Sequence, residues 1–323
     1  MNDLRSTFLP LAVAACVSTI GCASLAIATA PDKQAVHDDS AGAKVADAAF
    51  WSTLHGGHYE QIGGTLDLLE AAYLARPNDP KTAAHIGFLH IWRVSERERM
   101  ETVPPTVTDD IALARRYFDE AVRLDAKDAR IHGFLAATML AEGRIHSDEK
   151  LTRKGFFEMQ DAVSEWPEFN LFTRGYAMSG LPFDHERYAG AVEDQWATLD
   201  TCAHGERIDR KTADFAPYMG LETRTGRKRT CWNSWIAPHN FEGFFLNMGD
   251  MIVKAGDPKT ARKVYAQAKL SKEYSAWPYR DVLDRRIAQA DENVTWFRTP
   301  AKGDKERRIM GDSAFACTGC HQQ

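Results

Sequence analysis

The sequence has little of what marks several large classes of protein. Its 323 residues include 22 glycines and 13 prolines, too few for a collagen-like or low-complexity chain. Forty Lys and Arg face 45 Asp and Glu, and the net charge of −5 argues against a nucleic-acid binder, which needs a basic face. A mean hydropathy of −0.41 excludes a polytopic membrane protein. Six cysteines are too few for a disulfide-built scaffold, so their positions are more informative than their number.

Motifs of common enzyme classes are also missing. The chain has no Gly-rich phosphate loop, no H-E-x-x-H and no G-x-S-x-G. The adjacent carboxylates Asp109 and Asp110 fit a helix N-cap better than acid–base catalysis, and the charged stretches 97–99 and 224–229 are typical of solvated surface. The remaining composition, 44% hydrophobic and 26% charged, is ordinary for one elongated or two compact globular domains.

The N-terminus has the anatomy of an export signal. Residues 8–30 carry no charge and follow Arg5, a pattern that the secretion machinery reads. Cys16 and Cys22 lie inside this stretch, each preceded by small or aliphatic residues. Both resemble the lipobox of bacterial lipoproteins, and the resemblance implies that the cysteine is lipidated and becomes the first residue after cleavage. We favour Cys22, which leaves an apolar core of ordinary length, with Cys16 as the alternative.

Two other interpretations of this segment stay open. Ala28-Thr29-Ala30 is an A-x-A cleavage site that would release a soluble periplasmic protein, and the uncharged stretch is long enough to remain as a membrane anchor. All three place the body outside the cytoplasm. In a lipoprotein, Ala23 rather than Asp after the lipidated cysteine favours the outer membrane. Residues 1–22 are therefore expected to be the signal peptide, and residues 23–44, which are polar from Pro31 onward, a flexible linker.

Residues 45–290 are predicted to be all-α, because apolar residues recur there at spacings of three and four. The segment 241–278 is the most regular, with two helical patterns on either side of a Gly256-Asp257-Pro258 turn. Its residues are spaced as in a tetratricopeptide repeat: Phe245, Met248, Gly249, Ile252, Ala261, Tyr265 and Ala268. Gly249 and Ala261 would let two antiparallel helices approach, and Tyr265 would fill the groove beside them.

The same spacing recurs in weaker form upstream, and a helix is expected from Asn170 to Met178. The body therefore resembles a tetratricopeptide-like helix–turn–helix solenoid. The alternative is a generic helical bundle. Residues 94–110 and the longer, irregular insertion 179–240 depart from the pattern. Cys202 and Cys231 lie in the second insertion, and an oxidising compartment predicts a disulfide between them rather than two buried thiols.

The helical pattern is expected to stop at residue 290, and the tail, 291–323, ends in Cys317-Thr318-Gly319-Cys320-His321. C-x-x-C-H is the attachment motif of c-type haem: two thiols add to the haem vinyl groups, and the adjacent imidazole binds iron. The motif is similar to the start of small cytochrome c domains. That resemblance implies one covalent haem c on Cys317 and Cys320, with His321 as the proximal iron ligand.

The resemblance ends there, since only Gln322 and Gln323 follow and an ordinary cytochrome c fold is excluded. A sixth iron ligand would come from the body, from another chain, or be absent. The candidates in this chain are His55, His58, His85, His90 and Met310. The tail cysteines would otherwise form a redox disulfide or bind a metal.

The sequence thus predicts an exported, membrane-anchored helical-repeat protein with one c-type haem, acting in electron transfer or in assembling a redox complex. A protein partner, itself a redox protein, is expected in the repeat groove. The alternative is a non-redox scaffold lipoprotein whose tail cysteines are structural. A peroxidase-type haem enzyme, which needs an open iron face, is a third hypothesis.

Overall fold

The computed structural model describes residues 23–203, 206–234, 236, 239–299, 305 and 307–321. Cys16 and Cys22 lie outside these residues, so the lipidation site stays a prediction. The chain divides into two compact units, Met1–Ala35 and Val36–Gln323. In the first, residues 23–28 are helical, and both the backbone N–H and the hydroxyl of Thr29 donate to the Leu25 carbonyl. No helix among the described residues is long and apolar enough to cross a membrane.

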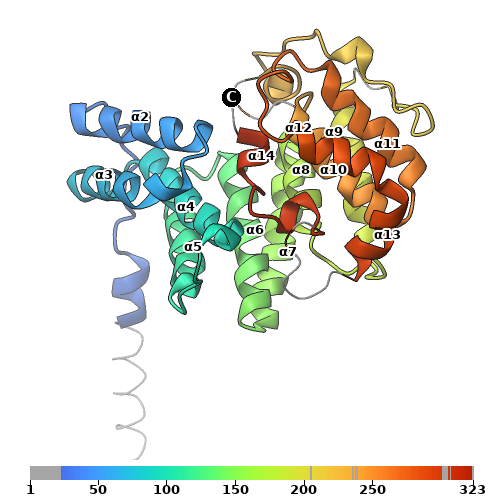
Figure 1. Cartoon of the computed structure of the whole chain (residues 1–323). Coiled ribbons are helices and arrows are strands. Elements are labelled where there is room, and N and C mark those ends of the chain that lie inside the picture. Colours follow the sequence, from blue (N-terminus) through green and yellow to red (C-terminus); the bar gives the residue numbers. More distant parts are fainter. Residues whose placement is uncertain are drawn as a thin grey trace, which may run out of the picture. The chain divides into compact units, whose positions relative to one another are not determined.

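The second unit is all-helical over its described part, as the sequence predicts (Figure 1). Its α-helices are α2 (Ala41–His55), α3 (Ile62–Ala75), α4 (Pro80–Ser95), α5 (Val107–Leu124), α6 (Ala129–Ile145), α7 (Glu149–Glu165), α8 (Pro167–Ala177), α9 (Tyr188–Cys202), α10 (Glu242–Ala255), α11 (Pro258–Gln267), α12 (Arg280–Ala288), α13 (Ala290–Arg298) and α14 (Thr318–His321). Short 3₁₀ turns connect them: η1 (Tyr59–Gln61), η2 (Arg97–Arg99), η3 (Ala216–Tyr218), η4 (Arg227–Thr230), η5 (Ala268–Leu270) and η6 (Met310–Asp312).

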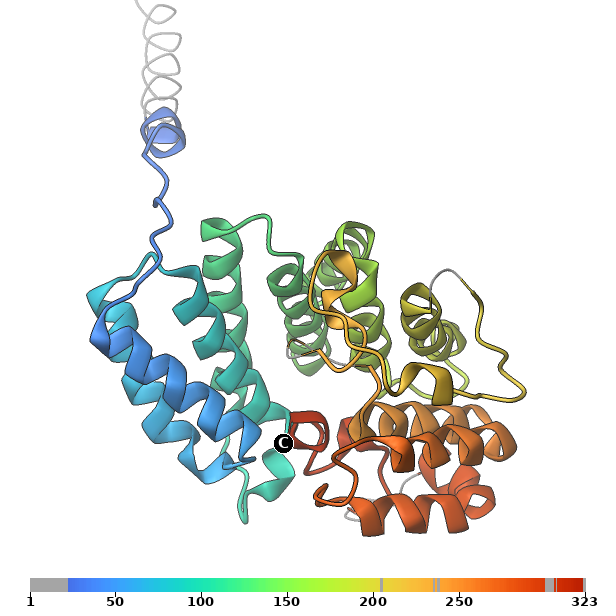
Figure 2. The ribbon, with the colours of Figure 1, turned by 90° about the horizontal axis from the view of Figure 1, so that it is seen from above.

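Helices that follow one another in the chain pack as pairs: α2 with α3, α4 with α5, α6 with α7, α8 with α9, and α10 with α11. The helices α12 and α13 pack against α11, and α13 also packs against α10. Figure 2 shows α2 to α5 at one end of this unit and α10 to α13 at the other, with the red C-terminal segment between them.

The same four residues, Asp-Pro-Lys-Thr, begin α4 and α11. Asp79 accepts the backbone N–H of Thr82 at 3.1 Å, and Asp257 accepts that of Thr260 at 3.0 Å. In both helices the proline occupies the first turn, where its missing N–H has no intrahelical partner to lose. Local sequence therefore fixes where these two helices begin.

Glycines let paired helices approach closely. A Cβ on Gly249 of α10 would lie 2.2 Å from the ring of Tyr265 in α11, and one on Gly87 of α4 would lie 3.1 Å from the ring of Phe118 in α5. Gly256 ends α10 with a φ of 106°, a left-handed conformation that favours glycine. The close packing expected of Gly249 and Tyr265 is therefore confirmed.

The helical body begins earlier than expected. Helix α2 starts at Ala41, where the Ser40 side chain accepts the N–H of Ala43, and Asp38 is buried. The Val36 N–H donates to the Asn78 carbonyl at 2.9 Å. Residues 36–44, expected to be linker, therefore belong to the folded unit. They are held by a helix cap and a backbone hydrogen bond rather than by a periodic apolar face.

The body also continues beyond the expected end at residue 290. Helix α13 runs to Arg298, because Ala290, Asn293 and Phe297 are buried on one face at spacings of three and four. This buried face is short and includes the polar residue Asn293, so the apolar periodicity of α13 is weak in the sequence. Helix α8 likewise begins at Pro167 rather than at Asn170, since proline is favourable in the first turn.

The insertion 179–240 is more regular than expected. It contains α9, which packs on α8 and α10, and irregular structure with two 3₁₀ turns follows in its described part. Cys202, the last residue of α9, is disulfide-bonded to Cys231, and both are buried. Trp232 stacks on Tyr218 at 5.1 Å, and both cysteines belong to the apolar cluster around α10.

Candidate functional site

The C-terminal motif is folded back onto the helical body. Helix α14 contacts α2 and α10 (Figure 2). Cys317 packs against the apolar cluster formed by α2, α3 and α4, whereas Cys320 packs against the cluster around α10. The motif therefore connects two separate parts of the core.

Glu96 binds the first residues of the motif. Its Oε1 accepts the backbone N–H groups of Cys317 and Thr318 at 2.7 and 2.8 Å, and the Thr318 hydroxyl at 3.1 Å. The Glu96 side chain is fully buried, and Nε of Arg99 lies 2.7 Å from its second oxygen. Bonds to a buried carboxylate are stronger than bonds to a neutral acceptor, so Glu96 fixes the backbone of the motif.

Three aromatic side chains from distant elements hold the rest of the motif. The indole N–H of Trp277 donates to the Gly319 carbonyl at 3.1 Å, and the hydroxyl of Tyr176 donates to the Ala316 carbonyl at 2.7 Å. The Tyr279 hydroxyl shares a 3.0 Å hydrogen bond with that of Thr318. Backbone groups at both middle positions of the motif thus have partners in the body.

Two glycines bring the motif and α10 into backbone contact. A Cβ on Gly243 of α10 would lie 2.2 Å from the carbonyl oxygen of Gly319, and one on Gly319 would lie 2.6 Å from Cε of Met310. The Gly243 contact is with backbone atoms and leaves no room for a side chain, whereas the atom near Gly319 is the end of the flexible Met310 side chain. Gly243 is therefore required for the tail to dock this closely.

Met310 is fully buried beneath the motif. Its N–H donates to Asp250 at 2.8 Å. The other Asp250 oxygen accepts the Tyr265 hydroxyl at 2.5 Å and lies 3.3 Å from Nε of Arg286. Burial raises the pKa of Asp250, and Arg286 opposes that rise. This buried network holds the start of the tail against α10 and α12.

Cys317 and Cys320 are not disulfide-bonded, and each residue is partly exposed. Burial raises the pKa of both, with the Glu96 carboxylate adding to the effect at Cys317, and the pKa of Cys320 reaches about 12. Redox-active C-x-x-C pairs have a lowered thiol pKa instead. The surroundings of this pair are therefore unfavourable for thiol–disulfide exchange.

His321 is surrounded by rings from α2 and α4. Its ring centre lies 5.8 Å from that of Phe88, edge to face, and 6.5 Å from that of His55, with the two imidazole planes 11° apart. Burial, and then the neighbouring His55, lower the pKa of His321 to about 4. The imidazole is therefore neutral near pH 7, the form that binds a metal.

The other candidate histidines have partners of their own. His85 stacks on Phe50 at 3.8 Å, and burial lowers its pKa to about 4. His90 shares a 2.7 Å hydrogen bond with Asp110 through Nδ1, and its Nε2 has no hydrogen-bond partner among the described residues. His58 is half exposed and lies 3.4 Å from Glu60. His55 alone of these histidines has a ring contact with His321 in the described part of the chain.

The charged insertion 94–110 supplies much of the tail-binding site. Besides Glu96, Arg99 donates to the Ala314 carbonyl at 2.7 Å, and Glu98 accepts Arg308 at 3.0 Å. Arg97 and Arg99 are exposed, as expected of a surface triplet at 97–99, but Glu98 and Arg99 also bind the tail. Nothing in the sequence pairs Glu96 with Cys317, which is 221 positions away.

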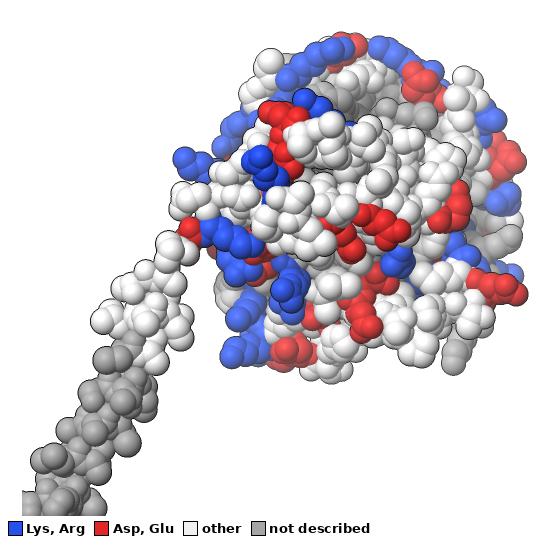
Figure 3. Space-filling view, turned by 90° about the vertical axis from the view of Figure 1, so that its left-hand side faces the viewer, with Lys and Arg blue, Asp and Glu red and all other residues white. Residues whose placement is uncertain are grey.

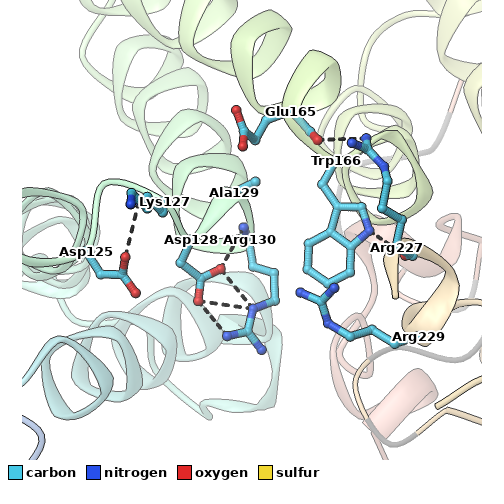
Figure 4. A pocket seen from close by; sticks show the side chains of 9 residues that line it. All are labelled: Asp125, Lys127, Asp128, Ala129, Arg130, Glu165, Trp166, Arg227 and Arg229. Carbon is cyan, nitrogen blue, oxygen red and sulfur yellow. Dashed lines mark hydrogen bonds and ion pairs between the residues drawn. The ribbon is translucent and has the colours of Figure 1, made fainter. Parts of the chain in front are cut away.

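A cavity of about 380 Å³ lies elsewhere, between the α5–α6 connection, the α7–α8 corner and η4 (Figure 4). Two of its charged side chains, Arg130 and Asp128, are bonded to each other. Arg229 lies 3.8 Å above the ring of Trp166, and Arg227 donates to the Glu165 carbonyl at 2.7 Å. The basic run 224–229 is thus partly docked. On the face seen in Figure 3, acidic and basic residues are interspersed.

In comparisons with protein-family models, curated proteins and solved structures, nothing matches this chain.

Proposed function

We propose that this chain carries one covalently bound c-type haem at its C-terminus and acts in one-electron transfer or in assembling a redox complex. Cys317 and Cys320 would form the thioether bonds, and His321 would bind the iron. The observation that carries the proposal is that C-x-x-C-H is docked on the body with both cysteines unpaired and each residue partly exposed.

The residues present fit a haem. The thiols are not bonded to each other, and the adjacent imidazole is neutral at physiological pH because of its lowered pKa. Haem would supply a one-electron redox couple. The chain's own residues hold and orient the site: Glu96 and Trp277 fix the backbone of the motif, while Phe88 packs edge-on against the imidazole.

We also propose a repeat architecture for the helical body and a location for the protein. The α10–α11 pair, with Gly249 against Tyr265, resembles the helix pair of a tetratricopeptide repeat. We take the body to be a solenoid of this kind, with a redox protein bound in its groove. Cys22, with Cys16 as the alternative, would anchor it by a lipid on the periplasmic side of a bacterial membrane.

A non-redox role for the tail is the second candidate. Helix α14 contacts both α2 and α10, so it would also serve as a clamp between two parts of the body. In that case a scaffold or assembly lipoprotein would keep Cys317 and Cys320 as thiols.

Haem staining after denaturing electrophoresis separates the two candidates. The chain should be co-expressed with the c-type haem maturation machinery, beside C317A/C320A and the matched control C202A/C231A. We expect a stained band and a Soret absorption for the wild type and the control, and neither for C317A/C320A. If the folded wild-type protein has neither signal, the haem proposal is wrong.

Membrane fractionation of cysteine variants tests the lipid anchor. Cys22→Ala should release the protein from membranes, and Cys16→Ala should not. Release by Cys16→Ala alone would move the lipidation site, and retention of both variants would favour an uncleaved membrane helix.

A further inference from the structure

The imidazole rings of His55 and His321 lie near each other with almost parallel planes. Their ring centres are 6.5 Å apart and their planes differ by only 11°. By comparison, the stacked pair Phe50 and His85 has ring centres 3.8 Å apart. The histidine pair is therefore nearly parallel but well beyond direct stacking distance.

This separation fits one metal atom between two imidazoles. Imidazole nitrogens bind metal ions at about 2 Å, so two nitrogens on opposite sides of one ion are about 4 Å apart. Each ring centre lies farther from the metal than the ligating nitrogen does. The distance expected between the two ring centres is therefore longer than the distance between the nitrogens, and close to the observed 6.5 Å. Near-parallel planes are compatible with this arrangement.

One side chain positions the segments that carry both histidines. Arg99 donates to the Thr318 hydroxyl at 2.7 Å, in the same short helix as His321. It also donates to the Gly57 carbonyl at 3.4 Å, two residues after His55. The turn after α2 and the C-terminal motif are therefore both bound by the Arg99 side chain.

The other candidates have different partners. His85 stacks on Phe50, and the Nδ1 of His90 is bonded to Asp110. His58 lies beside Glu60 at the surface. Met310 is fully buried, with its sulfur against Gly319.

We infer that His55 is the second axial ligand of the haem iron. The inference rests on the proposed function and extends it, because two histidine ligands fill the iron's coordination sphere. The site would then exchange one electron at a time with a partner, and it would leave no open position for peroxide. Two histidines also predict a lower reduction potential than a His–Met pair, since methionine ligation raises it.

Absorption and electron paramagnetic resonance spectra of the purified haem protein test this assignment. We expect a low-spin, six-coordinate iron in the wild type, in His58→Ala and in Met310→Leu. His55→Ala should retain the haem-stained band but lose the low-spin signal in favour of a high-spin one. His55→Met should restore the low-spin iron, with a reduction potential higher than that of the wild type.

The outcomes separate this inference from the proposed function. A stained band whose spectrum is unchanged in His55→Ala would overturn the assignment of His55 while leaving the haem proposal intact. Loss of the low-spin signal in His58→Ala or Met310→Leu, with His55→Ala unaffected, would transfer the ligand to that residue. A folded wild-type protein without a stained band would overturn both.

Discussion

The folded body contains two pairs of cysteines that differ in almost every physical respect. Cys202 and Cys231 are 29 positions apart, buried, and disulfide-bonded inside an apolar cluster. Cys317 and Cys320 are three positions apart, partly exposed and unbonded. The first pair lies among apolar side chains, whereas the backbone of the second is bound by buried polar groups such as Glu96.

The difference indicates what each pair is built for. A disulfide between distant, buried cysteines stabilises a fold mainly by limiting its unfolded state. The second pair adds no such constraint, yet the body uses a carboxylate, an indole and two tyrosines to hold it in place. Such an arrangement fixes the position of the thiols while leaving them free to bond to a further group.

Removing the disulfide should give the largest change in stability and leave the tail unchanged. For C202A/C231A we expect the free energy of unfolding to fall by about 3–4 kcal/mol, from the entropy of a loop of this length. Denaturant titration measures it, with haem staining of the folded fraction as the second readout. Loss of haem from folded C202A/C231A would contradict the separate roles of the two pairs.

Gly243→Ala should dislodge the tail with the disulfide intact. The new Cβ would lie 2.2 Å from the Gly319 carbonyl oxygen, and overpacking of this kind costs about 1–3 kcal/mol. We expect faster proteolysis after residue 298, while haem stays attached because the thioether bonds need only the motif.

Gly190→Ala is the matched control for that substitution. It changes an exposed helical glycine with no atom near the new Cβ, and should stabilise α9 by up to about 1 kcal/mol. Equal protease resistance in the two variants would show that α10 and the motif do not make backbone contact.

Glu96→Gln should loosen the motif locally. The amide keeps the shape of the side chain but exchanges charge-assisted hydrogen bonds for neutral ones, a loss of about 1–2 kcal/mol. Hydrogen exchange at the amides of Cys317 and Thr318 should accelerate. Glu98→Gln, whose partners Arg308 and Lys305 lie nearer the surface, should have less effect. A larger effect at Glu98 would place the main anchor elsewhere.

Mild acidification, from pH 6 to pH 5, should weaken the disulfide region through His239, in the smallest of these effects. Burial lowers the pKa of His239 from 6.5 to about 4, although its Nε2–H donates to the Glu168 carbonyl at 2.7 Å. The unfolded chain therefore binds this proton at a higher pH than the folded one. Stability is full above pH 6.5 and falls as the pH drops toward 4, by at most about 1.4 kcal/mol between pH 6 and pH 5.

His239→Gln should flatten this part of the stability profile, as measured by urea unfolding at several pH values. His58→Gln, which alters a half-exposed histidine, is the control variant. An unaltered slope in His239→Gln would mean that other groups dominate the acid response.

The sequence was sufficient for some features because they depend on local patterns. Helical periodicity predicted an all-α body, and Gly249 with Tyr265 predicted one helix pair in detail. The contacts that build the site were not predictable in this way. Glu96 and Trp277 are far from the motif in sequence, and a buried carboxylate in a charged stretch has the same local pattern as a solvated one. The end of the body was missed because α13 is short and buries a polar residue, Asn293.

Peptide mass spectrometry of the mature protein tests the central claim most directly, because one non-reducing digest reports on both pairs. We expect the peptide containing Cys317 and Cys320 to carry the mass of one haem, and the peptides containing Cys202 and Cys231 to remain linked. A haem-free tail peptide, with its two thiols reduced or joined to each other in protein made with the maturation machinery, would contradict the account.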